Sequence, residues 1–164
     1  MTTLDDFRET LTKDPADWLV LADWLEERGD DSATSVRYLA EQFVHGADTL
    51  SDFIRANEPR LRVLITFGRC LPDEALDRLV DAKRWFDFVM ALASLHVHWK
   101  KERERLLSML DDECRQVVLM SLNGCAGTMI ADRLRFAPSS VRLRFLEIYG
   151  EWRRELDQSS SWQE

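Results

Sequence analysis

Two short runs of apolar residues toward the C-terminal end of the chain, separated by a brief break, constrain the fold more than any other feature. Within each run the apolar residues recur three or four positions apart, which is the spacing of an amphipathic helix. The first run comprises Met129, Ile130 and Leu134, and the second, after Phe136, comprises Val141, Phe145, Ile148 and Trp152. This spacing predicts two helices that cross around one small core, a helix-turn-helix within residues 110–156.

The segment between the two runs has the composition of a tight turn. Ala131 provides a small side chain where the two helices should approach closely. The residues that follow the first predicted helix are Ala137, Pro138, Ser139 and Ser140. Such residues end one helix and open the next, so we expect them to form the turn and the N-cap of the second helix.

The same stretch is locally basic. Residues 133–144 contain four arginines and no acidic residue, although the chain of 164 residues has a net charge of −8. Residues 1–58 contain 5 Lys or Arg against 14 Asp or Glu, whereas residues 59–164 contain 17 against 16. The basic stretch predicts an anion-facing surface. The acidic N-terminal end would repel DNA, and it either masks the basic stretch or meets a basic partner.

These C-terminal residues resemble region 4 of the extracytoplasmic-function sigma factors. The resemblance runs without a gap through residues 115–119, 124, 130–134 and 140–144, and response-regulator output domains share much of the same pattern. It implies that the second helix enters the major groove of promoter DNA and that the domain docks on RNA polymerase. The residues that would face DNA are Arg135, Ser139, Ser140, Arg142, Leu143 and Arg144. Of these, the resemblance makes Arg142 and Arg144 candidates for phosphate or guanine contacts.

Two departures from the family pattern keep a second interpretation open. The family has glycine in the turn where this chain has Arg135, which must then accept an unusual backbone angle or reshape the turn. Leu143 and Leu146 put apolar side chains where a DNA-facing surface should be polar. A helix-turn-helix that docks on protein would have this composition. The alternative function is therefore a non-catalytic interaction or adaptor subunit of a larger bacterial complex.

Residues 1–46 form a separate predicted helical module. Asp14 and Pro15 are typical of a helix start, and Gly29 is typical of a helix end. This start and the run 19–30 resemble the bacterial repeat-companion domain, a helical module for which the resemblance implies no particular activity. The carboxylates of the run are interpreted as a solvated helix face rather than a metal or catalytic site. The candidate protein-interaction residues of the whole chain are Trp18, Trp24, Leu143 and Leu146.

The middle of the chain, residues 47–107, is predicted to be helical. We expect a long helix from Leu71 to Leu95. Its predicted inner side comprises Leu76, Leu79, Val80, Ala82, Phe86, Val89, Met90 and Ala93. Residues 53–64 and 77–82 resemble the start of sigma region 2, but the aromatic, basic segment for promoter melting does not follow. We therefore expect a sigma-derived regulator or a helical adaptor rather than a complete sigma factor.

The sequence as a whole predicts an all-α protein without visible catalytic chemistry. Residues 108–157 would form the helix-turn-helix domain and residues 158–164 a flexible tail. The cysteines are widely spaced, and His96 and His98 would point about 200° apart on a helix, so no disulfide framework or metal site is indicated. We expect no catalytic residue, cofactor or small-molecule substrate. No run approaches the roughly 20 apolar residues of a membrane span, and a cytoplasmic location is expected.

Overall fold

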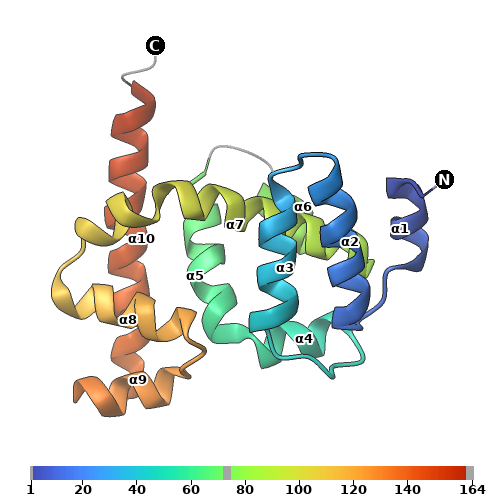
Figure 1. Ribbon diagram of the computed structural model, residues 1–164. Helices are drawn as coiled ribbons and strands as arrows, with labels where there is room; N and C mark the ends of the chain where they lie inside the picture. The colour runs from blue at the N-terminus through green and yellow to red at the C-terminus, as the bar shows by residue number, and fades with distance from the viewer. Residues whose placement is uncertain (1, 72–74, 162–164) are drawn as a thin grey trace. The chain divides into compact units, whose positions relative to one another are not determined.

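The computed structural model describes residues 2–71 and 75–161 and has an all-α fold (Figure 1). This described part of the chain contains ten helices and no strand, as the sequence predicts. It divides into two compact units. One consists of residues 2–57 and 75–98, and the other of residues 58–71 and 99–161.

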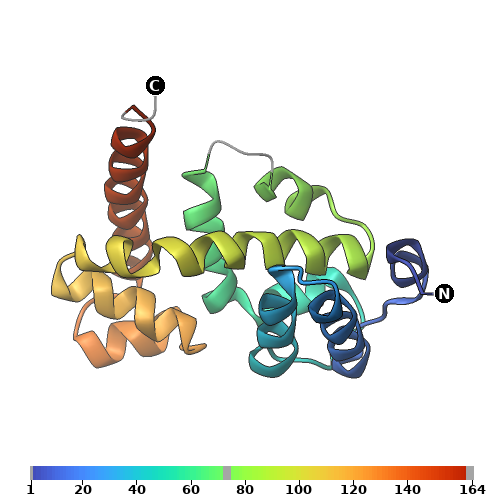
Figure 2. The ribbon, with the colours of Figure 1, turned by 45° about the horizontal axis from the view of Figure 1, so that its top comes forward.

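The first unit is built from short helices with well-defined ends. It contains α1 (Leu4–Thr10), α2 (Pro15–Glu27), α3 (Ser32–Gln42), α4 (Leu50–Ala56), α6 (Ala75–Asp81) and the N-terminal part of α7 (Trp85–Ser108). α2 and α3 form a hairpin whose helices lie side by side in both views (Figures 1 and 2). The Asp14 carboxylate accepts a hydrogen bond from the Ala16 backbone N–H, and Gly29 has a φ of +69° after the last turn of α2. The predicted start and end of this helix are therefore confirmed.

An aromatic cluster around Phe53 forms the core of the first unit. The Phe53 ring centroid lies 5.6 Å from those of Trp18 and Trp85 and 5.8 Å from that of Phe88. Trp18 is fully buried, and its Nε1 donates a hydrogen bond to the Thr12 carbonyl over 2.7 Å. Because these rings come from α2, α4 and α7, their packing joins helices that are distant in sequence.

The prediction of one long helix from Leu71 to Leu95 is wrong. The chain leaves the helical conformation at residues 82–84, between α6 and α7, and residues 72–74 lie outside the described residues. Val80, predicted to face the core, is 73% exposed. α7 begins at Trp85, whose ring packs against Trp18 and Phe53, so tertiary packing sets the course of α7 independently of the pattern in α6.

The second unit contains α5 (Glu58–Arg69), the C-terminal part of α7, α8 (Asp112–Leu122), α9 (Gly127–Leu134) and α10 (Pro138–Ser161). The Trp99 ring lies 5.5 Å from Phe67 and 5.3 Å from Trp152. The Trp152 indole N–H donates a hydrogen bond to the Leu106 carbonyl over 3.1 Å. α5 packs against α8 and α10. These contacts anchor the middle of α10 in the core of this unit.

The boundaries of the two units do not coincide with the expected modules 1–46, 47–107 and 108–157. α4 belongs to the first unit and α5 to the second, and α7 contributes residues to both. The expected flexible tail begins at residue 158, but α10 continues to Ser161. Residues 162–164 lie outside the described residues. A helix that supplies apolar residues to two cores cannot be assigned to one module from local sequence.

Candidate nucleic-acid interface

α8, α9 and α10 pack on one another as a helix-turn-helix, with residues 135–137 joining α9 to α10. Arg135 has φ +61° and ψ +47° and is the one non-glycine residue with a positive φ in the described part of the chain. The backbone N–H groups of Arg135 and Phe136 both donate to the Ala131 carbonyl and close the end of α9. The turn is thus made with a left-handed arginine, at a cost of roughly 1–2 kcal/mol relative to a residue without a Cβ atom.

The core of the motif follows the predicted spacing at most positions, with Leu134 and Phe136 half-buried. Its buried side chains are those of Ile130, Ala131, Val141, Phe145, Ile148 and Trp152. Met129, predicted to belong to the apolar stripe of α9, is 47% exposed. The short helix α9 buries only a narrow face, and Ile130 and Ala131 already occupy it.

The N-terminal half of α10 presents one exposed face. Ser139, Arg142, Leu143 and Leu146 are all exposed, and their spacing places them on one side of the helix. We call these four residues the α10 stripe. Leu143 is 57% and Leu146 is 60% exposed. α10 begins at Pro138, so Ser139 and Ser140 lie in its first turn rather than before it, and Ser140 is half-buried.

Arg144 does not belong to the α10 stripe. Its Nε donates to Glu113 Oε1 of α8 over 2.7 Å, and its Nη1 donates to Glu147 Oε2 over 3.0 Å. Hydrogen bonds to Glu147 and Glu113 raise the pKa of the guanidinium above its usual range. The side chain is 31% exposed. Arg144 therefore bridges α8 and α10, and its charge is offset by two carboxylates.

Three of the four arginines in residues 133–144 form no ion pair within the described part of the chain. These are Arg133, Arg135 and Arg142, and all three are exposed. They lie on α9, in the turn and on the α10 stripe. The basic character expected from the sequence thus rests on these three side chains, because Arg144 is engaged elsewhere.

The other candidate protein-interaction residues lie in the first unit. Trp18 is fully buried and cannot contact a partner, because its ring belongs to the aromatic cluster around Phe53. Trp24 is partly exposed; its ring lies 5.5 Å from that of Phe7, and the Arg28 guanidinium lies 3.7 Å above it. Trp24 therefore holds α1 against α2.

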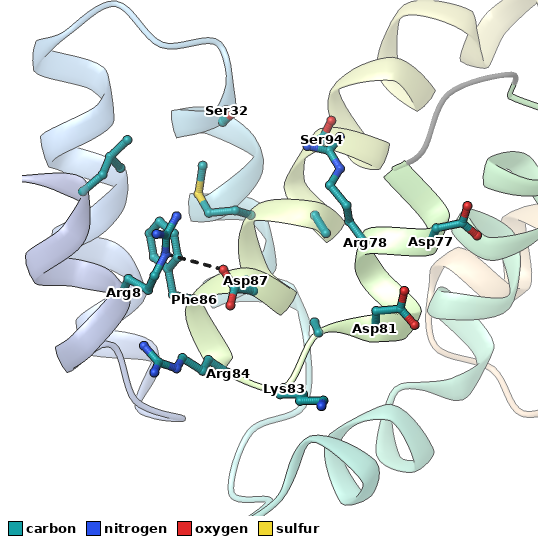
Figure 3. Close-up of a pocket in the computed structure, with 14 residues that line it drawn as sticks. Arg8, Ser32, Asp77, Arg78, Asp81, Lys83, Arg84, Phe86, Asp87 and Ser94 are labelled. Atoms are coloured by element: carbon teal, nitrogen blue, oxygen red, sulfur yellow. Dashed lines mark ion pairs between the residues drawn. The ribbon is translucent and has the colours of Figure 1, made fainter.

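A cavity of about 900 Å³ lies in the first unit (Figure 3). Its lining includes Phe86 and Met90 together with charged residues of both signs from α1, α6 and α7. The Arg8 Nε lies 3.7 Å from Asp87 Oδ1 and the guanidinium lies over the Phe86 ring. Arg84 also lines the cavity, and it pairs with Glu9, which does not. This cavity was not predictable from local sequence, because its lining comes from separate segments, and its mixed charges select no ligand class.

Other chemistry is limited in the described part of the chain. No group of three or more His, Cys, Asp or Glu residues is placed to hold a metal ion within residues 2–71 and 75–161. Burial raises the pKa of the Cys70 thiol to about 11 and that of Cys114 to about 12. Both thiols are therefore protonated near neutral pH. Among the helices that the structure describes, none combines the length and apolar character needed to cross a membrane.

No family model, curated protein or solved structure matches this chain.

Proposed function

We propose that the helix-turn-helix formed by α8, α9 and α10 binds duplex DNA and that the chain is a transcription regulator of sigma-factor-like type. The observation that carries the proposal is the exposed α10 stripe, which contains Arg142, together with exposed Arg133 on α9 and Arg135 in the turn, all three without an ion pair in the described chain. A helix of this exposure can enter a major groove while neighbouring cations contact phosphates. The resemblance of residues 115–144 to sigma region 4 supports the same function.

The individual residues have distinct roles under this proposal. Arg142 and Ser139 face base edges or phosphates from the first turns of α10, and Arg135 contacts phosphate from the turn. Arg144 is left out of the contact set because Glu113 and Glu147 hold it. RNA polymerase is the expected protein partner. The chain would act in the cytoplasm without catalytic residues or a cofactor.

The salt dependence of DNA binding tests the proposal directly. The full chain is titrated against a fluorescein-labelled duplex of random sequence, and anisotropy is measured between about 50 and 200 mM KCl. With three unpaired arginines, the slope of log affinity against log salt should be about −2 to −3. Arg142→Ala should weaken binding and reduce the magnitude of the slope by about 1.

The matched control is Arg103→Ala, which removes an exposed arginine from α7, a helix outside the α8–α10 motif. It should leave both affinity and slope unchanged. Equal losses in the two variants would mean that the net charge of the chain governs binding rather than the α10 stripe. The absence of binding at the lowest salt concentration would rule out the proposal.

A second candidate function is a non-catalytic interaction subunit that docks on protein through α10. The exposure of Leu143 and Leu146 on one helix face favours it, because contiguous exposed apolar surface marks protein interaction sites. Affinity capture of the tagged full chain from its native host, with and without nuclease, distinguishes the two functions. A complex recovered regardless of nuclease and lost in Leu143→Asp would favour the docking function.

A further inference from the structure

We propose that Leu143 and Leu146 recognise thymine methyl groups in the major groove, so that the DNA bound by this chain is selected partly by apolar contacts. This inference rests on the proposed DNA-binding function and concerns its specificity. The C5-methyl of thymine is the apolar group that base pairs present in the major groove, and apolar side chains contact it in direct readout.

The position of the two leucines supports this role. They share the α10 stripe with Ser139 and Arg142, the residues that would face the bases first. Three residues of helix span about 4.5 Å along the axis, compared with about 3.4 Å between successive base pairs. A helix lying in the groove with Arg142 at a base edge would therefore bring Leu143 and Leu146 to the same or neighbouring base pairs.

The composition of the stripe gives the second argument. Because Arg144 is held by Glu113 and Glu147, Arg142 is the one cation on the stripe. Ser139 adds one hydroxyl, and the remaining two side chains are leucines exposed by more than half. They pack in no core of the described chain, so their apolar surface is free for a ligand. This face can form few polar contacts with bases, and apolar contacts must supply the rest of the discrimination.

The experiment compares thymine with uracil, which differs only by the missing methyl group. A pool of random duplexes is first selected with the full chain, and the enriched duplex is resynthesised with deoxyuridine at each thymine in turn. Affinity should fall roughly fourfold at each position whose methyl is contacted, as expected for exposing one methyl-sized apolar group. Leu143→Ala and Leu146→Ala should each abolish the thymine preference at one position without changing the salt slope.

Val20→Ala is the matched control, because Val20 is an exposed aliphatic residue of α2 in the first unit. It should keep the full thymine preference. Thermal melting of each leucine variant checks that the fold is intact, which is expected because both side chains are exposed.

The other possible outcomes distinguish failure of the thymine inference from failure of the DNA-binding proposal. Tight binding with equal affinity for the thymine and uracil duplexes would overturn this inference while leaving the DNA-binding function in place. A selection that enriches no sequence, with anisotropy still showing salt-dependent binding, would have the same meaning. If no duplex binds at any salt concentration, both proposals fail, and protein docking through the leucines becomes the better account.

Discussion

The α2–α3 and α9–α10 hairpins turn with similar backbone geometry but different residues. Gly29 follows α2 with φ +69°, and Arg135 follows α9 with φ +61°. Glycine adopts this conformation without steric cost, whereas arginine incurs roughly 1–2 kcal/mol. The α9–α10 turn therefore carries backbone strain that a glycine at position 135 would relieve. Under the proposed function, a phosphate contact by the Arg135 side chain would be the reason for this strain.

A second parallel concerns the arginine bridge in each unit. Arg37 of α3 lies 2.9 Å from carboxylate oxygens of both Asp23 and Glu26 in α2. Arg144 of α10 binds Glu113 of α8 and Glu147 of its own helix. In each unit one arginine therefore joins two helices by bridging two carboxylates. The ion pairs of Arg144 give it a structural role, whereas the resemblance to sigma region 4 made it a candidate for a DNA contact.

The largest expected effect on stability comes from substitutions of buried residues in α2 and α9, the helices that precede the two turns. Leu25→Ala in α2 and Ile130→Ala in α9 each remove a buried aliphatic side chain. Each should lower the free energy of unfolding by about 2–5 kcal/mol, as measured by urea denaturation. Met129→Ala is the control, since Met129 is adjacent to Ile130 and exposed, and it should change stability by less than about 0.5 kcal/mol. An equal loss in Met129→Ala would show that α9 packs differently.

Substitutions of the two turn residues should have opposite effects on the free energy of unfolding. Gly29→Ala introduces a Cβ atom at a left-handed position and should destabilise the chain by about 1–2 kcal/mol. Arg135→Gly removes that strain and should stabilise the chain by up to about 1 kcal/mol, while weakening DNA binding through the loss of a cation. Thermal melting and anisotropy give the two readouts. If Arg135→Gly bound DNA as tightly as the parent chain, the Arg135 side chain would not contact DNA.

The N-cap of α8 should make the stability of the helix-turn-helix depend on pH. The Asp111 carboxylate accepts a hydrogen bond from the Cys114 backbone N–H over 2.7 Å, which lowers its pKa. A lowered pKa means that the carboxylate stabilises the fold above its unfolded pKa of about 3.9, and that this contribution is lost as the pH falls through the folded pKa. Asp111→Ala should cost about 1 kcal/mol at neutral pH.

Asp111→Asn separates the cap from the charge, because an amide oxygen also accepts the capping hydrogen bond. It should retain most of the stability at neutral pH and lose the acid dependence of this group. Denaturation curves recorded between neutral pH and about pH 3 measure both effects. An unchanged acid profile in both variants would contradict the assigned role of Asp111.

The smallest expected effect concerns the Arg144 bridge. Arg144→Ala should lower stability by less than about 1 kcal/mol, because the ion pairs are partly exposed and screened. If Arg144 only positions α10, the variant should leave the salt slope of DNA binding unchanged, in contrast to Arg142→Ala. Arg37→Ala provides the equivalent bridge variant in the first unit. A slope reduced by about 1 in Arg144→Ala would instead identify a phosphate contact.

Much of the candidate site could be predicted because it is local in sequence. The apolar period through Ile130, Val141 and Phe145 predicted the two helices and their buried faces, although α10 begins at Pro138, within the segment expected to form the turn and N-cap. The pairing of Arg144 was not predictable, because Glu113 lies in another helix and its approach depends on how α8 packs against α10. The prediction of one continuous helix from Leu71 to Leu95 was wrong for a similar reason, because α7 begins at Trp85, whose ring packs against a residue of α4.

The sequence by itself determined the helical class, the cap at Asp14 and the spacing of the helix-turn-helix, because these depend on residues within a few positions of one another. Only the tertiary structure decided which arginines remain unpaired, which leucines stay exposed and which tryptophans are buried. These properties depend on contacts between segments far apart in the chain. Burial and ion pairing are properties of the packed surface, and no local pattern specifies them.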